Sequence, residues 1–389
     1  MTPLFVFCAD LHLDDGAWST RPGIYGDSYY SFSQIVTYCV SHNLPLVLGG
    51  DVLEKKSNSA RPIAKLCAGL SQMQSAGVPV YYIQGNHEYD RNAPWLSVHP
   101  WPQHMHSKGV CDISGVSVAG LDWLPRGEIQ SALSDVPQDT EILVTHQVWK
   151  DFMGNVGRPE CELTDVHHVE TVLAGDFHIT KTAESKNAQN RPVKMLSPGS
   201  TSMQDIGECP DKCFFVIAKD VDGFSFQRVD LLTRQFRQFV VETQEELDDL
   251  CAGALGNAIE EAIGIAESAG VPEEIIKPFV RVRFNKQIPD AYIRITTIVG
   301  ETAHLFCDAL PDKKTANKSC VKESQSIVKN TVLTALADLL GEQTQEYKLA
   351  VKLVQSVSPA KELEAQFKKH MGEADATSSV SCKELGAPS

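Results

Sequence analysis

Five short polar motifs follow apolar runs along the chain, and they constrain its fold more than any other feature. They are Asp10-Leu11-His12, Gly50-Asp51, Gly85-Asn86-His87-Glu88, Thr145-His146 and Gly175-Asp176-Phe177-His178. Each motif lies at or just beyond a run of residues that is typical of a buried strand. Because ligands of α/β sheets gather at the carboxyl ends of strands, we expect the motifs to meet in space.

The side chains of these motifs suit two adjacent divalent cations. Carboxylate, amide and imidazole groups are ligands for Mn, Mg, Fe and Zn. Asp10 and His12 are two residues apart, so an extended backbone would turn both side chains to one side. Asp176 and His178 repeat this spacing. Asp51 follows two glycines that let the backbone approach the cations, and its carboxylate could bridge them. A hydroxide that bridges two such cations is a nucleophile for phosphorus, so the motifs predict a two-metal phosphoesterase.

Strand and helix patterns alternate in the first part of the chain and predict an α/β fold. Short apolar runs indicate strands at 4–8, 44–48, 78–83, 113–119, 142–144 and 171–174. Helical patterns cover 27–40, with Asp27 as a plausible cap, and 60–76. The polar segment 181–191 is expected to be a loop.

The rest of the chain predicts a hairpin, a small α+β unit and C-terminal helices. The expected elements are a hairpin at 214–217 and 224–229, strands at 236–241 and 278–284, and a helical stretch at 245–269 interrupted near Gly253 and Gly256. Residues 311–318 form a polar, Lys-rich linker, and apolar residues recur beyond it at helical spacing. These apolar stripes either pack on the α+β unit or dock on a partner. The last dozen residues are expected to be disordered.

The net charge of −15 argues against a generally basic nucleic-acid binder. Residues 313–389 contain eleven Lys and nine Asp or Glu, so a net charge of −17 falls on residues 1–312. A nuclease with such an acidic body would need metals, a local basic strip or a partner to hold DNA. The charge balance is therefore the main compositional argument against a nuclease.

The sequence contains no apolar run that approaches the ~20 residues needed to cross a bilayer. The apolar N-terminal run is too short for a signal peptide and lacks a basic start. The eleven cysteines form no disulfide framework, and Cys209 and Cys213 fit two unrelated thiols better than a zinc site. We therefore expect a cytoplasmic protein, in the host cytoplasm if a phage encodes it, with no membrane partner.

The five motifs resemble the pattern of the calcineurin-like metallophosphoesterase superfamily, which runs D-x-H, GD, GNH[DE], H and GHxH. Three further segments resemble the SbcD-type DNA-repair nucleases, which work with SbcC-type coiled-coil ATPases. They are Leu196-Ser197-Pro198-Gly199-Ser200-Thr201, Leu232-Thr233-Arg234-Gln235-Phe236 and Pro278-Phe279-Val280-Arg281-Val282. The resemblance covers roughly residues 1–290. It implies a β-sandwich flanked by helices at 1–232, a small α+β DNA-capping domain at 233–312, and a linker, partner-binding helices and tail at 313–389.

The resemblance also implies roles for single residues. By position, Asp10, His12, Asp51 and His178 would hold one metal, and Asp51, Asn86, His146 and Asp176 the other. His87 would be the catalytic residue that steadies the transition state or protonates the leaving oxygen. The implied activity is that of a DNA exonuclease and endonuclease with two divalent cations, Mn²⁺ before Mg²⁺. The implied partners are DNA, an SbcC-type ATPase and a second copy of the chain.

Two positions depart from the family pattern. Asp176 stands where an imidazole is usual, so two divalent cations would keep one net positive charge instead of two, which favours hard Mn²⁺ or Mg²⁺. We expect Asp176 to bind metal, because Asp is a competent ligand, and the alternative is a weakened second site. Glu54 stands where some relatives have His, and it either supports a ligand or is solvated.

Two other functions stay open. A phosphatase or small phosphodiesterase could use the same centre on a protein or nucleotide, and a non-enzymatic scaffold could retain the fold with a crippled site. A simple phosphatase needs neither a capping unit nor partner helices, so residues 233–389 favour the nuclease.

Aromatic side chains could stack on bases, although buried aromatics are commoner; the candidates are Trp95, Trp101 and Trp149. A histidine-rich loop, with His99, His104 and His106, fits ordinary packing better than a third metal.

Overall fold

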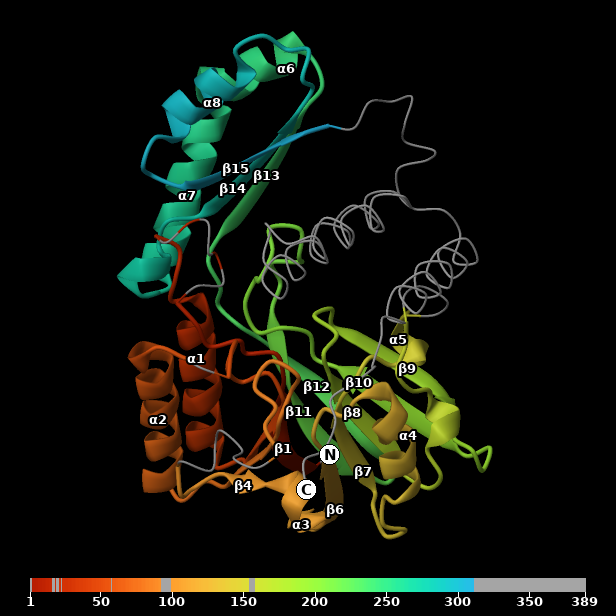
Figure 1. The fold of residues 1–389 in the computed structure, drawn as a ribbon. Helices are drawn as coiled ribbons and strands as arrows, with labels where there is room; N and C mark the ends of the chain where they lie inside the picture. The colour runs from red at the N-terminus through yellow and green to blue at the C-terminus, as the bar shows by residue number, and fades with distance from the viewer. Residues whose placement is uncertain are drawn as a thin grey trace, which may run out of the picture. The chain divides into compact units, whose positions relative to one another are not determined.

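The computed structural model describes residues 2–310 except for 16–17, 19–20, 22, 57, 92–98 and 154–157. The linker, helices and tail expected at 313–389 lie outside the described residues. The described part forms two six-stranded mixed sheets and a three-stranded parallel sheet (Figure 1). Its helices are all too short or too polar to span a membrane.

The first sheet has the strand order β12-β11-β1-β2-β3-β4 and carries three of the five motifs. Its strands are β1 (Thr2–Cys8), β2 (Leu46–Gly49), β3 (Val80–Ile83), β4 (Gln103–His104), β11 (Cys213–Asp220) and β12 (Gly223–Asp230). The strands β1 to β4 are parallel, so the motifs that follow β1, β2 and β3 lie at one edge. The expected hairpin is confirmed as β11 and β12, and β11 pairs antiparallel with β1.

The second sheet has the order β5-β6-β7-β8-β10-β9 and carries the other two motifs. Its strands are β5 (Val110–Ile113), β6 (Val116–Leu121), β7 (Ile142–His146), β8 (Thr171–Gly175), β9 (Lys181–Lys186) and β10 (Pro192–Ser197). The helices around the two sheets are α1 (Asp27–His42), α2 (Ala60–Ser75), α3 (Met105–Lys108), α4 (Arg126–Ser134) and α5 (Lys150–Met153). Figure 1 shows α1 and α2 beside the first sheet and α4 beside the second.

The two large sheets pack face to face, and alternate residues of β1 serve the two faces. Phe5 and Phe7 belong to a buried cluster with Val144 of the second sheet. Val6 and Cys8 belong to the cluster that includes α1 and α2. Because both faces of β1 are buried, its sequence is a continuous apolar run. The predicted β-sandwich flanked by helices is confirmed.

Two secondary-structure predictions are wrong. The single strand expected at 113–119 is the hairpin of β5 and β6, because Ser114 and Gly115 have left-handed φ angles of 57° and 82° and form a two-residue turn. The loop expected at 181–191 contains β9, which pairs antiparallel with β10 at the sheet edge. Most residues of β9 are exposed, so the strand lacks the apolar alternation that marks a half-buried strand.

The three-stranded unit (residues 236–309) has the strand order β13-β14-β15. Its elements are β13 (Phe236–Val241), α6 (Gln244–Asp249), α7 (Leu255–Ser268), β14 (Phe279–Phe284), α8 (Ala291–Val299) and β15 (His304–Ala309). The two strands expected here are confirmed as β13 and β14. The expected helical interruption is also present, because Gly253 has a φ of 153° between α6 and α7. The helix α8 and strand β15 complete the unit, and the sequence patterns do not indicate them.

Arg234 joins the start of this unit to α1. Its side chain is 1% exposed, and two of its nitrogens donate to the two carboxylate oxygens of Asp27, each at 2.9 Å. It also donates to the backbone carbonyls of Tyr25, Glu274 and Lys277. Asp27 is the first residue of α1, and Gly26, not Asp27, occupies the cap position. The carboxylate of Asp27 therefore binds Arg234 and does not cap the helix.

Replacing Arg234 with methionine is expected to lower the free energy of unfolding by about 3–5 kcal/mol, because it leaves the mostly buried Asp27 carboxylate without its partner. Urea unfolding followed by tryptophan fluorescence measures this loss. Arg228→Met is the control, since the ion pair of Arg228 with Asp230 is exposed and is worth at most about 1 kcal/mol. Equal losses in the two variants would contradict a special role for Arg234.

Candidate metal centre

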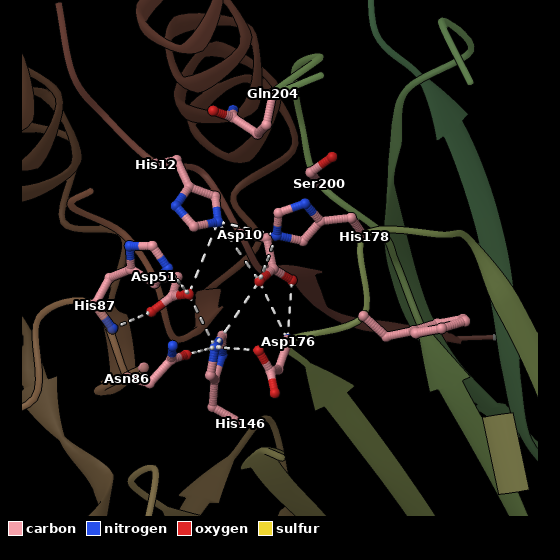
Figure 2. A network of polar contacts seen from close by, with 12 residues as sticks. Asp10, His12, Asp51, Asn86, His87, His146, Asp176, His178, Ser200 and Gln204 are labelled. Carbon is pink, nitrogen blue, oxygen red and sulfur yellow. Dashed lines mark hydrogen bonds and ion pairs between the residues drawn. The ribbon is translucent and has the colours of Figure 1, made fainter. Parts of the chain in front are cut away.

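The structure gathers all eight predicted site residues at one edge of the sandwich, as Figure 2 shows. They lie at or just beyond the ends of five strands: Asp10 and His12 after β1, Asp51 after β2, Asn86 and His87 after β3, His146 at the end of β7, and Asp176 and His178 after β8. Three strands of the first sheet and two of the second therefore contribute side chains to the same place. The parallel strands of the two stacked sheets make this convergence possible.

The first group of donor atoms comes from His12, His178, Asp10 and Asp51. The Nε2 atoms of His12 and His178 lie 3.1 Å apart. Asp10 Oδ1 lies 3.9 Å from His12 Nε2 and 3.8 Å from His178 Nε2. Asp51 Oδ2 lies 3.8 Å from His12 Nε2. This is the residue set that the family resemblance implies for one cation.

The second group surrounds His146 Nε2. Asp51 Oδ2 lies 3.1 Å and Asn86 Oδ1 3.2 Å from this nitrogen. Asp10 Oδ1 and Asp176 Oδ1 each lie 3.9 Å from it. Asp51 Oδ2 therefore borders both groups, which is the position required of a carboxylate that bridges two cations.

Three of the donor contacts have the spacing of ligands around a cation. Adjacent ligands about 2.1 Å from a metal ion lie about 3.0–3.4 Å from one another in octahedral or tetrahedral geometry. The contacts at 3.1, 3.1 and 3.2 Å have this spacing, and those at 3.8–3.9 Å are wider. The outer ring nitrogens are used elsewhere: His12 Nδ1 donates to Glu54 Oε2 at 2.6 Å, and His146 Nδ1 donates to the Gly49 carbonyl at 2.8 Å. The Nε2 lone pairs and the carboxylate oxygens thus face one another, and this arrangement calls for positive charge between them.

The pKa values at the site show that its carboxylates stabilise a positive charge placed between them. Burial opposes protonation of His146, but Asp51 and Asp10 outweigh it and raise the pKa of His146 well above its usual value. Burial opposes ionisation of Asp51, but the nearby imidazoles, with His146 first, lower its pKa. Burial raises the pKa of Asp176 to about 6, with Asp10 and Asp51 adding to the shift and His146 opposing it. The centre therefore attracts cations.

The backbone is not extended at Asp10, His12 and Asp176, so the extended segments expected for the Asp-x-His pairs are wrong, although the side chains of both pairs do lie at the same centre. Four candidate ligands have left-handed φ angles: Asp10 at 53°, His12 at 46°, Asp51 at 48° and Asp176 at 73°. Such a backbone is costly for residues other than glycine and persists only where its surroundings hold it. Here Asp10 N donates to the Gly50 carbonyl and His12 N donates to the Asp51 carbonyl. The loops after β1 and β2 thus hold each other in place.

Glu88 and Gly85 fix the loops on either side of the Asp51 carboxylate. Glu88 is buried and accepts hydrogen bonds from Leu53 N at 2.7 Å and Gly85 N at 3.3 Å. Burial and the charge of Asp51 raise the pKa of Glu88 to about 8. A Cβ atom on Gly85 would lie 2.1 Å from Asp51 Oδ1, so only glycine leaves room for this carboxylate.

His87 stands beside the two donor groups without belonging to either. Its Nδ1 donates to the Glu54 carbonyl at 2.8 Å, and its backbone N donates to Asp51 Oδ1 at 3.0 Å. Its ring is partly exposed, with Nε2 3.9 Å from Asp51 Oδ2, so it can reach a substrate bound at the centre. Glu54, for which the sequence leaves two roles open, contacts His12 and is therefore more than a solvated residue.

Several other sequence candidates have structural partners. Trp149 is fully buried and donates to Thr145 Oγ1, so it is not available to stack on bases. Trp101 donates to the Val78 carbonyl, and Trp95 lies outside the described residues. His104 has a structural partner too, since its Nε2 lies 2.9 Å from both carboxylate oxygens of Asp122. This contact agrees with ordinary packing of the histidine-rich loop and not with a third metal site.

The sequence motifs leave out one residue that lies at the centre, Glu208. Glu208 Oε1 lies 3.1 Å from His178 Nδ1. The two residues are 30 positions apart, and Glu208 belongs to none of the five motifs. Only the fold brings this carboxylate to the outer side of the imidazole.

Comparisons with known proteins agree with this geometry. A family model described as calcineurin-like phosphoesterase matches residues 3–180. The DNA double-strand break repair protein Mre11 of Haloferax volcanii is 24% identical over 260 residues, which are 63% of this chain and 56% of that protein. Mre11 of Halobacterium salinarum is 23% identical over 222 residues, or 53% of this chain and 54% of that protein. Mre11 of Methanosarcina acetivorans is 21% identical over 222 residues, or 54% of this chain and 36% of that protein.

The matched regions span about half the length of the first two relatives and about a third of the third. All five motifs lie within the region of the family model, and their side chains meet at one edge of the sandwich. The donor groups are of the kind that divalent cations occupy in two-metal hydrolases. Fold, donor groups and sequence similarity agree that residues 3–180 form a calcineurin-like phosphoesterase region, in a chain distantly similar to the archaeal Mre11 DNA repair proteins.

Proposed function

We propose that this chain is a DNA exonuclease and endonuclease that uses two divalent cations, as the nuclease subunit of an SbcCD-like DNA repair complex. The observation that carries the proposal is the position of Asp51 Oδ2, which borders two groups of donor atoms. The residues that would hold the cations are Asp51 for both, Asp10, His12 and His178 for one, and Asn86, His146 and Asp176 for the other. Bound cations would activate water and neutralise charge on the phosphodiester. His87 would protonate the leaving oxygen or stabilise the transition state.

Features beyond the metal centre favour DNA as the substrate. The relatives are named as DNA double-strand break repair proteins. A three-stranded unit follows the sandwich, and a simple phosphatase would not need it. We propose that residues 233–312 cap bound DNA, that residues 313–389 dock on a coiled-coil ATPase, and that the chain forms a homodimer. The net charge of −17 on residues 1–312 favours the alternative, a phosphatase or small phosphodiesterase acting on a protein or nucleotide.

Degradation of linear DNA by the purified full chain tests the proposed function. We expect Mn²⁺ to support degradation, Mg²⁺ to support it less, and chelation by EDTA to lower the rate at least about 100-fold, because charge neutralisation by the cations is worth several kcal/mol. A gel assay with end-labelled and circular substrates distinguishes exonuclease from endonuclease activity. Hydrolysis of an aryl phosphate while DNA stays intact, even with the ATPase partner present, would support the phosphatase instead.

The identity of the cations is proposed to be Mn²⁺, with Mg²⁺ as the second choice. Three carboxylates and one amide make the donor groups rich in oxygen, and Mn²⁺ and Mg²⁺ prefer oxygen ligands. Asp176 contributes one of these carboxylates in place of an imidazole. It therefore sets the metal preference of the second cation site.

Asp176→His is expected to keep two cations per chain and to strengthen Zn²⁺ binding about tenfold relative to Mn²⁺, because imidazole is a softer ligand than carboxylate. Metal content after dialysis against each ion, measured by mass spectrometry, gives both stoichiometry and preference. Asp112→His, at an exposed position of β5, is the control for an added imidazole. One ion in the wild type and two in Asp176→His would contradict Asp176 as a ligand.

A further inference from the structure

The three imidazoles of the donor groups differ in how tightly the protein encloses them. The side chains of His12 and His146 are 2% and 0% exposed, whereas that of His178 is 32% exposed. Dense packing alone fixes a buried ring in one orientation. His178 lacks this confinement on one side, so another contact must keep its Nε2 directed toward Asp10.

Glu208 provides that contact from the loop between β10 and β11, with Oε1 3.1 Å from His178 Nδ1. A carboxylate at the outer nitrogen of a metal-binding histidine fixes both its tautomer and its orientation. We propose that Glu208 is a positioning residue, which accepts the Nδ1 proton of His178 and holds Nε2 ready for a cation. The inference rests on the proposed function, because it takes His178 as a metal ligand.

Glu208 is itself held firmly by its second oxygen. Lys212 Nζ lies 2.7 Å from Glu208 Oε2 and also donates to Ser200 Oγ at 2.7 Å. Ser200 Oγ and Gln204 N donate to the same carboxylate oxygen at 3.1 and 3.3 Å. The Lys212 side chain is only 4% exposed, so its charge acts on Glu208 with little screening by solvent. One carboxylate oxygen is thus anchored, and the other is left for His178.

The contacts of Glu208 agree with this division of its two oxygens. Oε2 receives hydrogen bonds from Lys212 Nζ, Ser200 Oγ and Gln204 N, whereas Oε1 faces His178 Nδ1 at 3.1 Å. A carboxylate oxygen that faces a ring nitrogen accepts its hydrogen, which leaves the lone pair of a neutral His178 on Nε2, 3.8 Å from Asp10 Oδ1.

The loop that carries Glu208 is bonded to two of the metal motifs. Ser200 N donates to the His178 carbonyl at 3.4 Å, and Thr201 N donates to the Asp10 carbonyl at 3.3 Å. Figure 2 shows Ser200 and Gln204 above the two imidazoles of the first donor group. Because the same loop holds the backbone of His178 and the outer nitrogen of its ring, main chain and side chain are fixed together.

Two measurements on the full-length chain test the role of Glu208. In the first, the protein is labelled with ¹⁵N-histidine and kept in EDTA, and ring nitrogen shifts report the tautomer of His178, assigned with a His178→Gln spectrum. We expect the Nδ1–H tautomer in the wild type and a mixture in Glu208→Ala. In the second, titration with MnCl₂ by calorimetry is expected to show about 10–100-fold weaker binding at one of two sites in Glu208→Ala.

Two further variants separate positioning from loss of charge or of fold. Glu141→Ala is the matched control, because Glu141 also pairs with a lysine and a serine but touches no candidate ligand. It removes the same charge and is expected to leave Mn²⁺ affinity and the His178 tautomer unchanged. Glu208→Gln keeps the volume and an accepting oxygen, so its affinity should lie between those of the wild type and Glu208→Ala. It also keeps the test open if the alanine variant does not fold.

The two measurements distinguish failure of the inference from failure of the proposed function. Wild-type Mn²⁺ affinity together with an unchanged tautomer in Glu208→Ala would overturn the role of Glu208. A wild-type chain that binds no Mn²⁺ would instead overturn the two-metal proposal. In that case the tautomer measurement in EDTA would still decide whether Glu208 orients the imidazole.

Discussion

Asp51→Asn is expected to lower the rate of Mn²⁺-dependent DNA hydrolysis at least about 1,000-fold, or about 4 kcal/mol of transition-state stabilisation. The carboxylate borders both donor groups, so its loss weakens both cation sites together. The amide keeps the shape of the side chain and can still accept the hydrogen bond that His87 N donates at 3.0 Å. The substitution therefore removes charge at the centre and retains this backbone contact. Degradation of linear DNA and metal content after dialysis are the measurements.

Asp112→Asn provides the control for this substitution. Asp112 is exposed and caps the turn between β5 and β6 by accepting from Gly115 N. It is expected to hydrolyse DNA at the wild-type rate and to retain both cations. If Asp51→Asn also retained two tightly held cations, a shared Asp51 carboxylate would be excluded, and the two donor groups would have to act separately.

His87→Gln is expected to retain both cations but to hydrolyse DNA about 100–10,000-fold more slowly, because the alkoxide that leaves the phosphorus is no longer protonated. His87 lies outside both donor groups, and its Nδ1 is occupied by the Glu54 carbonyl. A substrate with a good leaving group needs no proton. The rate on bis(4-nitrophenyl) phosphate should therefore fall far less than the rate on DNA, and comparison of the two rates measures the role of His87.

The outcomes for His87 separate three roles. Loss of a cation in His87→Gln would make His87 a ligand. Equal losses on DNA and on the aryl diester would favour stabilisation of the transition state over protonation of the leaving oxygen. His42→Gln, at the exposed end of α1, is the control and should match the wild type on both substrates.

The sequence predicts that the motifs meet, because the residues able to bind metal stand at the ends of predicted strands. Asp51 and His146, for example, lie at the ends of buried strands, and strands that run parallel in one sheet end at the same edge. The order of the strands is less predictable. Phe7 pairs with Phe215, far along the chain, and such a register depends on which faces become buried together.

Other features of the centre depend on the folded backbone and have no local pattern. The left-handed backbone of Asp10 and His12 arises from hydrogen bonds to the loop after β2, whereas the spacing alone suggests an extended segment. Glu208 reaches His178 only after the loop between β10 and β11 folds back. Residues that act through long-range contacts of this kind are invisible to periodicity, because neither their neighbours nor their spacing marks them.

The left-handed backbone of four candidate ligands has a consequence for how this sequence was selected. Each such residue costs up to about 1–2 kcal/mol of backbone strain that glycine would not incur. Acidic and imidazole side chains nevertheless stand at all four positions. This is the trade-off between stability and activity that is expected where a site serves chemistry and not packing.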